Sequence, residues 1–172
     1  MNPVRPADPF PDFSFNLISG DSVKVSDHLG TWVMVIVYRG DHCPRCKAYI
    51  KRLHDLAPQY ADRGVEILLA VTDPESVVKH TAAENQWTLP VAHSLTLDQC
   101  KQLSLYLTPH AADNPVGGYY AEPGLFLVNP QGETQVIATS NSPSVRPDLE
   151  VVLDGIIGTQ ERNLPTRGTY FG

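Results

Sequence analysis

Apolar residues follow two patterns along the chain, continuous runs and helical stripes. Residues 32–38 (WVMVIVY) and 65–71 (VEILLAV) form continuous runs rich in β-branched side chains, which is typical of strands buried on both faces. Between the runs, six residues at helical spacing predict an amphipathic helix: Cys46, Tyr49, Leu53, Leu56, Ala57 and Tyr60. Gly64 directly precedes the second run and predicts the end of that helix.

The rest of the pattern predicts shorter elements. Asp73 and Pro74 suit the N-cap and the first position of a helix. The predicted elements are a hairpin turning at residues 20–21, a helix over 73–87, a strand at 90–93, a helix at 98–106, an irregular segment at 107–124, a hairpin at 125–139 and a helix starting at 146. This order predicts an α/β fold with a mixed sheet and helices on both faces.

Size and composition indicate one domain. A chain of 172 residues that is 42% hydrophobic predicts a single domain over 1–172, with an extended arm at 1–12 and a polar tail at 159–172. The 13 basic and 19 acidic residues give a net charge of −6, which argues against a nucleic-acid surface. No stretch reaches the roughly 18 apolar residues of a membrane span. The N-terminus lacks the apolar core of a signal peptide, so we expect a cytoplasmic protein that contacts no membrane.

Two of the three cysteines, Cys43 and Cys46, stand between the first apolar run and the helical stripe. Pro44 is favoured at the first helical position, which makes Cys43 the N-cap and Cys46 the third helical residue. A thiolate at the N-cap accepts backbone N–H groups and faces the positive end of the helix dipole, and both effects lower its pKa. We therefore predict an exposed, activated thiolate at Cys43 and a shielded thiol at Cys46 within disulfide range.

Such a thiol pair has three uses: a redox centre, half of a metal site, or two inert core side chains. A zinc site needs four ligands, and Cys100 is the only other cysteine in the sequence. An inert pair does not explain the strand–turn–Pro–helix setting. The setting favours thiol–disulfide chemistry without a metal.

Residues 11–46, PDFSFNLISGDSVKVSDHLGTWVMVIVYRGDHCPRC, resemble the thioredoxin-like superfamily. They are most similar to the redoxins of the alkyl hydroperoxide reductase and thiol-specific antioxidant group, which are peroxiredoxin-like and carry Y-R-G-x-x-C-P-x-C. The resemblance continues in EPGLFLVNPQGE and RPDLEVVLDGII and is weaker between residues 75 and 120.

The resemblance implies a thioredoxin-like α/β/α sandwich with Cys43 as the attacking and Cys46 as the resolving cysteine. Pro123 matches the cis-proline that faces the disulfide in this superfamily; a trans proline that starts a strand is the alternative. The implied redox group is the disulfide itself, with no bound cofactor. The implied partners are a thiol reductant of thioredoxin or glutathione type and a disulfide or peroxide substrate, and a homodimer is one arrangement we consider.

The sequence departs from the peroxiredoxin pattern P-x-x-x-T/S-x-x-C, because Ile36 and Gly40 hold the proline and hydroxyl positions. The missing hydroxyl, which helps orient a peroxide, favours a disulfide substrate, whereas the family resemblance favours a peroxide. Arg39 and Arg146 are candidates for the arginine that these proteins place near the thiolate. His42 is a candidate to tune the thiolate or move a proton, and a solvated loop histidine is the alternative.

We therefore predict a thiol-dependent redox enzyme that reduces disulfides or peroxides through Cys43 and Cys46. Arg39, Gly40, His42 and Pro123 are the predicted substrate-binding residues. The alternative is a non-catalytic thioredoxin-like module whose thiols hold a metal or a partner.

Outside the thiol pair, Cys100 shares helical spacing with Leu97 and Leu103 and is predicted to lie in the core, with a distal resolving thiol as the alternative. Tyr119 and Tyr120 either line a substrate groove or hold the 107–124 segment against the domain.

Overall fold

The computed structural model describes residues 3–114 and 116–170, so the ends of the predicted arm (1–2) and tail (171–172) lie outside the described residues. The strands are β1 (Phe15–Leu17), β2 (Ser22–Val23), β3 (Trp32–Val37), β4 (Val65–Ala70), β5 (Val91–His93), β6 (Leu107–Pro109), β7 (Tyr119–Ala121), β8 (Gly124–Val128) and β9 (Thr134–Thr139). The helices are the 3-10 helix η1 (Val25–His28) and α1 (Pro44–Asp62), α2 (Glu75–Glu84), α3 (Leu97–Gln102) and α4 (Leu149–Arg162).

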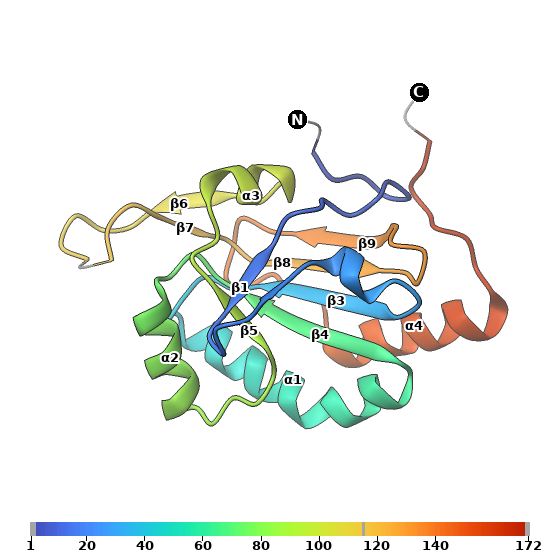
Figure 1. Ribbon diagram of the computed structural model, residues 1–172, viewed down its shortest axis with the longest axis horizontal. Helices are drawn as coiled ribbons and strands as arrows, with labels where there is room; N and C mark the ends of the chain where they lie inside the picture. The colour runs from blue at the N-terminus through green and yellow to red at the C-terminus, as the bar shows by residue number, and fades with distance from the viewer. Residues whose placement is uncertain (1–2, 115, 171–172) are drawn as a thin grey trace.

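The central sheet has the strand order β2-β1-β5-β4-β3-β8-β9 (Figure 1). Strand β3 pairs in parallel with β4 and antiparallel with β8. Helices α1, α2 and α4 cover one face, and α3 and the N-terminal arm cover the other (Figure 1). The predicted mixed α/β sheet with helices on both faces is confirmed.

The two apolar runs are the central strands, as predicted. Successive residues of β3 point to opposite faces, so Met34 and Ile36 join one core cluster while Val33 and Val35 join the other. Burial on both faces explains why these strands read as continuous apolar runs. The described part of the chain contains no helix with both the length and the apolar character that a membrane crossing requires.

The register brings three chain segments together at one edge of the sheet. Val37 pairs with Ala70 on one side and with Gly124 on the other. The loop after β3, the segment after β4 and the residues before β8 therefore meet at this edge. That edge carries the thiol pair, Asp73 and Pro123.

Several sequence-based helix boundaries were wrong, including the end of α2, which lies at Glu84 and not at residue 87. Pro74 is the N-cap of α2, and its helix begins at Glu75; the Asp73 carboxylate instead accepts the Asp41 N–H at 2.8 Å. Helix α3 ends at Gln102, because Ser104 adopts a left-handed backbone with φ 54°. Helix α4 begins after Asp148, whose side chain accepts the Val151 N–H. The same helix runs through Arg162, beyond Gly158, where we expected a polar tail.

The sequence predicted an irregular segment at 107–124, and this is wrong at its two ends, which form strands β6 and β7. Strands β6 and β7 pair antiparallel as a separate two-stranded sheet, with Leu107 opposite Ala121 and Pro109 opposite Tyr119. This β6–β7 hairpin projects from the side of the domain at the thiol edge (Figure 1). Each strand has only three residues, which is too short for an alternation pattern to be read from sequence.

Candidate active site

The thiol pair stands at the junction of β3 and α1, in the predicted positions. Cys43 is the N-cap of α1 with an extended backbone, and Pro44 takes the first helical position. The Cys46 backbone N–H donates to the Cys43 sulfur at 3.3 Å. Cys46 lies on the buried stripe of α1 with Ile50 and Leu53.

The two sulfur atoms are in direct contact. Cys46 Sγ lies 2.6 Å from Cys43 Sγ and donates its S–H to it. This hydrogen bond is the largest effect that lowers the pKa of Cys43, to about 5, and the Cys46 backbone N–H, Arg39 and Arg146 act in the same direction against burial. The same bond, together with burial, raises the pKa of Cys46. Cys43 is therefore the thiolate of the pair, and Cys46 holds the proton.

Both candidate arginines face the sulfurs. Arg39 Nη1 lies 3.8 Å from Cys43 Sγ. Arg146 Nη2 lies 3.0 Å from Cys46 Sγ and 3.9 Å from Cys43 Sγ. One guanidinium comes from the loop directly before the pair, and the other comes from the segment that leads into α4. Two positive groups beside one sulfur stabilise a thiolate there.

Arg39 is held in place by residues before β8. Its Nε lies 2.9 Å from Glu122 Oε2 in a buried ion pair. Its Nη2 donates to the Tyr120 hydroxyl at 2.8 Å, and its guanidinium lies 4.8 Å from the Tyr120 ring centre. Thr108 donates to the other Glu122 oxygen at 2.7 Å. Sequence reasoning missed Glu122, whose only signal is a charged residue at the start of an apolar strand.

Cys43 is not exposed, contrary to the prediction. Both Cys43 and Cys46 have only 1% of their surface exposed. The difference arises because Arg39 and Arg146 lie against the sulfurs, and the sequence does not reveal that these distant side chains meet there. A substrate can approach Cys46 beside Arg146, because both residues line one cavity.

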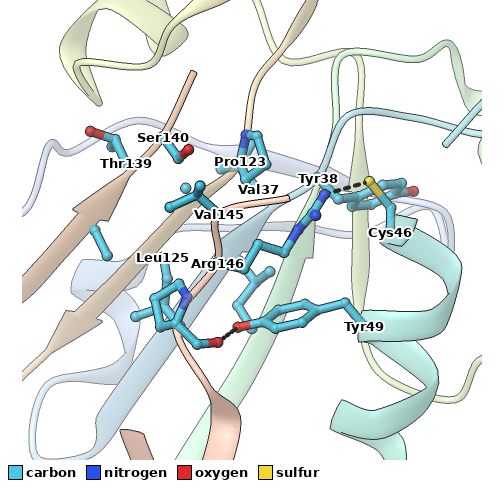
Figure 2. A pocket seen from close by; sticks show the side chains of 14 residues that line it. Val37, Tyr38, Cys46, Tyr49, Pro123, Leu125, Thr139, Ser140, Val145 and Arg146 are labelled. Atoms are coloured by element: carbon cyan, nitrogen blue, oxygen red, sulfur yellow. Dashed lines mark hydrogen bonds between the residues drawn. The ribbon is translucent and has the colours of Figure 1, made fainter. Parts of the chain in front are cut away.

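A cavity of about 210 Å³ opens beside Cys46. We call it the Arg146 pocket; its lining includes Cys46, Tyr49, Pro123, Val145 and Arg146. Figure 2 shows the Arg146 side chain pointing across the pocket to the Cys46 sulfur, and the Tyr49 hydroxyl donating to the Pro147 carbonyl. The pocket is mostly apolar around one fixed cation, so it suits a small substrate with an apolar body.

Pro123 lines this pocket, as expected for a residue facing the thiols, but its peptide bond is trans. The predicted cis bond is therefore wrong. The Glu122 N–H donates to the Tyr106 carbonyl at 2.8 Å, and the Pro123 carbonyl accepts the Ser140 N–H at 3.0 Å. These bonds extend the pairing of β7 with β6 and the pairing of β8 with β9. The chain stays extended between β7 and β8, which a trans peptide bond at Pro123 allows.

Gly40 has a backbone that favours glycine, with φ 131°. A Cβ at this position would lie 2.6 Å from Asp73 Oδ2 and 2.8 Å from Asp73 Oδ1. The position that carries the hydroxyl in the peroxiredoxin pattern is thus glycine because a buried carboxyl group fills the space. Sequence reasoning assigned Asp73 to a helix cap and missed this contact.

His42 is an exposed residue whose ring contacts two others. The ring centres of His42 and Tyr120 are 4.6 Å apart, and those of His42 and His110 are 5.5 Å apart. Burial is the largest effect on its pKa, which is lowered; Arg39 acts in the same direction. Burial and Arg39 therefore disfavour the charged form of His42. His110 belongs to the same group of rings.

Cys100 is separated from the thiol pair by the sheet. It is fully buried in the core cluster formed by the opposite face, and burial raises its pKa to about 11. The predicted core position is confirmed. Among the described residues there is no group of three or more His, Cys, Asp or Glu side chains arranged to hold a metal ion.

The chain is similar to proteins of one redox family. Residues 6–137 match the model of the AhpC/TSA family. The chain is 27% identical to a thioredoxin peroxidase of Fasciola hepatica over 170 residues, covering 92% of this chain and 84% of that protein. It is 35% identical to the thiol-disulfide oxidoreductase ResA of Oceanobacillus iheyensis over 94 residues, covering 52% of this chain and 48% of that one.

Solved structures show the same fold. A mutant of peroxiredoxin 6 from Arenicola marina superposes with a TM-score of 0.81 at 16% identity, covering 97% of this chain and 80% of that one. AhpC of Mycobacterium tuberculosis superposes with a TM-score of 0.73 at 19% identity, covering 95% and 97%. The thioredoxin-like fold is thereby confirmed.

Proposed function

Because the chain belongs to the AhpC/TSA family, we propose that it is a thiol-dependent peroxidase that works through an internal Cys43–Cys46 disulfide. The observation that carries the proposal is the contact between the two sulfurs. Cys43 accepts hydrogen bonds from both the S–H and the N–H of Cys46. A thiolate stabilised in this way, with its resolving thiol already touching it, is suited to a two-step redox cycle.

In the first step the Cys43 thiolate attacks one oxygen of a hydroperoxide. A sulfur–oxygen bond forms, the oxygen–oxygen bond breaks, and Cys43 becomes a sulfenic acid. Arg39 and Arg146 are placed to stabilise negative charge on the thiolate and on the oxygen atoms that approach it.

In the second step Cys46 attacks the sulfenic sulfur. The thiol proton of Cys46 and the hydroxyl of the sulfenic acid leave as water, and the Cys43–Cys46 disulfide forms. An external thiol then reduces the disulfide and is itself oxidised. We propose a donor of thioredoxin or glutathione type for this step, and a cytoplasmic setting, where such donors keep thiols reduced.

The roles of the two cysteines are tested by the products of one equivalent of peroxide. The wild-type protein should give the Cys43–Cys46 disulfide, and Cys46→Ser should give a Cys43 sulfenic acid that dimedone traps. Cys100→Ser is the matched control and should behave as wild type, because Cys100 lies in the other core cluster. Disulfide formation in Cys43→Ser would contradict the proposal; the readout is intact-protein mass spectrometry.

A thiol–disulfide reductase is the second candidate, and Gly40 is the observation that favours it. Without a hydroxyl at position 40, one peroxide-orienting group of the peroxiredoxin pattern is missing. The deep burial of Cys43 favours a small substrate over a protein disulfide. The test is turnover with hydrogen peroxide and with a small aromatic disulfide, measured with the same dithiol reductant. Faster turnover of the peroxide supports the peroxidase, and faster turnover of the disulfide supports the reductase.

A further inference from the structure

The proposed redox cycle gives no role to Asp73, a buried residue beside the loop that carries Cys43. Asp73 has only 3% of its surface exposed. Its Oδ2 accepts the Asp41 N–H at 2.8 Å, whereas its Oδ1 is buried with no hydrogen-bond partner among the described residues. A buried polar atom left without a partner destabilises the folded protein. In native proteins such atoms are uncommon, and a catalytic role is one explanation for them.

The Asp73 carboxyl group is pressed against the loop that carries Cys43. Both of its oxygens would lie within 2.8 Å of a Cβ at Gly40. The Gly40 carbonyl in turn accepts the Cys43 N–H at 3.2 Å. Glycine at position 40 therefore admits an acidic group to the base of the active-site loop, and a larger residue would displace it.

Two histidines share this region with Asp73. His110 Nε2 is buried and has no hydrogen-bond partner among the described residues. The charges of His42 and His110 both act on the Asp73 carboxyl, and the charges of Asp73 and Cys43 both act on His42. His110 reaches this place from the end of β6, because the β6–β7 hairpin holds its ring against His42 and Tyr120. We call Asp73, His42 and His110 the acid–imidazole cluster.

Burial sets the protonation of the acid. It is the largest effect on Asp73 and raises the pKa of its carboxyl; the Asp41 N–H and the two histidines oppose the rise, and the charge of the Asp41 carboxylate adds to it. A carboxyl group with a raised pKa keeps its proton at higher pH than an exposed one, which is the property of a general acid.

We propose that Asp73 and His110 bind the oxygen atoms of the hydroperoxide at Cys43 and that Asp73 gives its proton to the leaving oxygen. This inference rests on the proposed peroxidase function. It assigns the cluster a catalytic role that the sulfurs and arginines do not fill, because neither thiolate nor guanidinium readily supplies a proton.

The step balances. Cys43 thiolate forms its bond to one oxygen, the oxygen–oxygen bond breaks, and sulfur gives up two electrons. The second oxygen leaves as an alkoxide, or as hydroxide from hydrogen peroxide, and takes the Asp73 proton to become an alcohol or water. Asp73 is then a carboxylate. It recovers a proton when the external dithiol reduces the disulfide and Cys43 returns from thiol to thiolate.

The test compares two reactions of the same thiolate. Peroxide needs a proton for its leaving oxygen, whereas iodoacetamide releases iodide and needs none. Asp73→Asn should lower the single-turnover rate with hydrogen peroxide by about 100-fold, the usual scale of general-acid catalysis, and leave the alkylation rate near that of wild type. His110→Gln should lower the peroxide rate less and also spare alkylation.

Asp55→Asn is the control acid, because Asp55 lies on α1, its carboxylate pairs with Lys51, and its charge does not act on Asp73. It should keep the wild-type ratio of the two rates. The proposal is overturned if Asp73→Asn and His110→Gln keep that ratio, or if both reactions slow together, which would indicate a structural role. If Asp73→Asn does not fold, His110→Gln alone decides. A wild-type protein that does not react with peroxide contradicts the proposed function itself, a result distinct from any change in the ratio.

Discussion

At the scale of single residues, the state of Cys43 depends on the hydrogen that Cys46 donates to it. The Cys46 side chain is the largest effect that lowers the Cys43 pKa to about 5. Cys46→Ala removes this donor and should raise the Cys43 pKa, whereas Cys46→Ser keeps a hydroxyl donor and should raise it less. The pH dependence of iodoacetamide alkylation measures both. Equal values for the two variants and wild type would contradict this role of Cys46.

Arg146 is the second residue on which reactivity depends. Its guanidinium is held by the Pro143 carbonyl and lies 5.6 Å from the Tyr49 ring centre. A hydrogen bond from a charged group contributes about 1.5–3 kcal/mol, so Arg146→Ala should slow the peroxide reaction about 10- to 100-fold. Arg146→Lys should recover part of the loss, because it keeps the charge without the planar fork. Stopped-flow kinetics measure this, and an unchanged rate in Arg146→Ala would exclude the arginine from the site.

At the scale of elements, the β6–β7 hairpin positions the active site through Tyr120. Tyr120→Phe removes the hydroxyl that accepts from Arg39, and a neutral hydrogen bond contributes about 0.5–1.5 kcal/mol. The peroxide rate should therefore fall about 2- to 10-fold. Tyr119→Phe is the matched control in the same strand and should leave the rate unchanged. Equal rates in the two variants would contradict the positioning role.

The central elements could be predicted from sequence, and the parts of the site that come from distant segments could not. The runs at 32–38 and 65–71 and the Cys43-Pro44 start of α1 have strong local signals. The β6–β7 hairpin has none, since its strands are short and pair only with each other. Asp73 was misread because an aspartate before a proline favours a helix cap, whereas its carboxyl is used by the neighbouring loop.

At the scale of the whole molecule, the thiolate links stability to pH. The folded-state pKa of Cys43 is lowered from 9.0 to about 5, so the thiolate adds stability that is fully present above the unfolded pKa. This contribution declines as the pH falls from 9.0 to about 5, and it is lost below about 5. The difference in unfolding free energy between reduced wild type and Cys43→Ser should therefore shrink from alkaline to acidic pH. Anaerobic urea unfolding checks it, and a constant difference would contradict the lowered pKa.

The central claim is that Cys43 is a thiolate at neutral pH and is activated toward peroxides. The most direct measurement is the single-turnover rate of the reduced protein with hydrogen peroxide as a function of pH. We predict a rate well above that of free cysteine, with a half-maximum near pH 5, the Cys43 pKa. A rate no faster than that of free cysteine, rising only near the ordinary cysteine pKa of 9.0, would contradict the account.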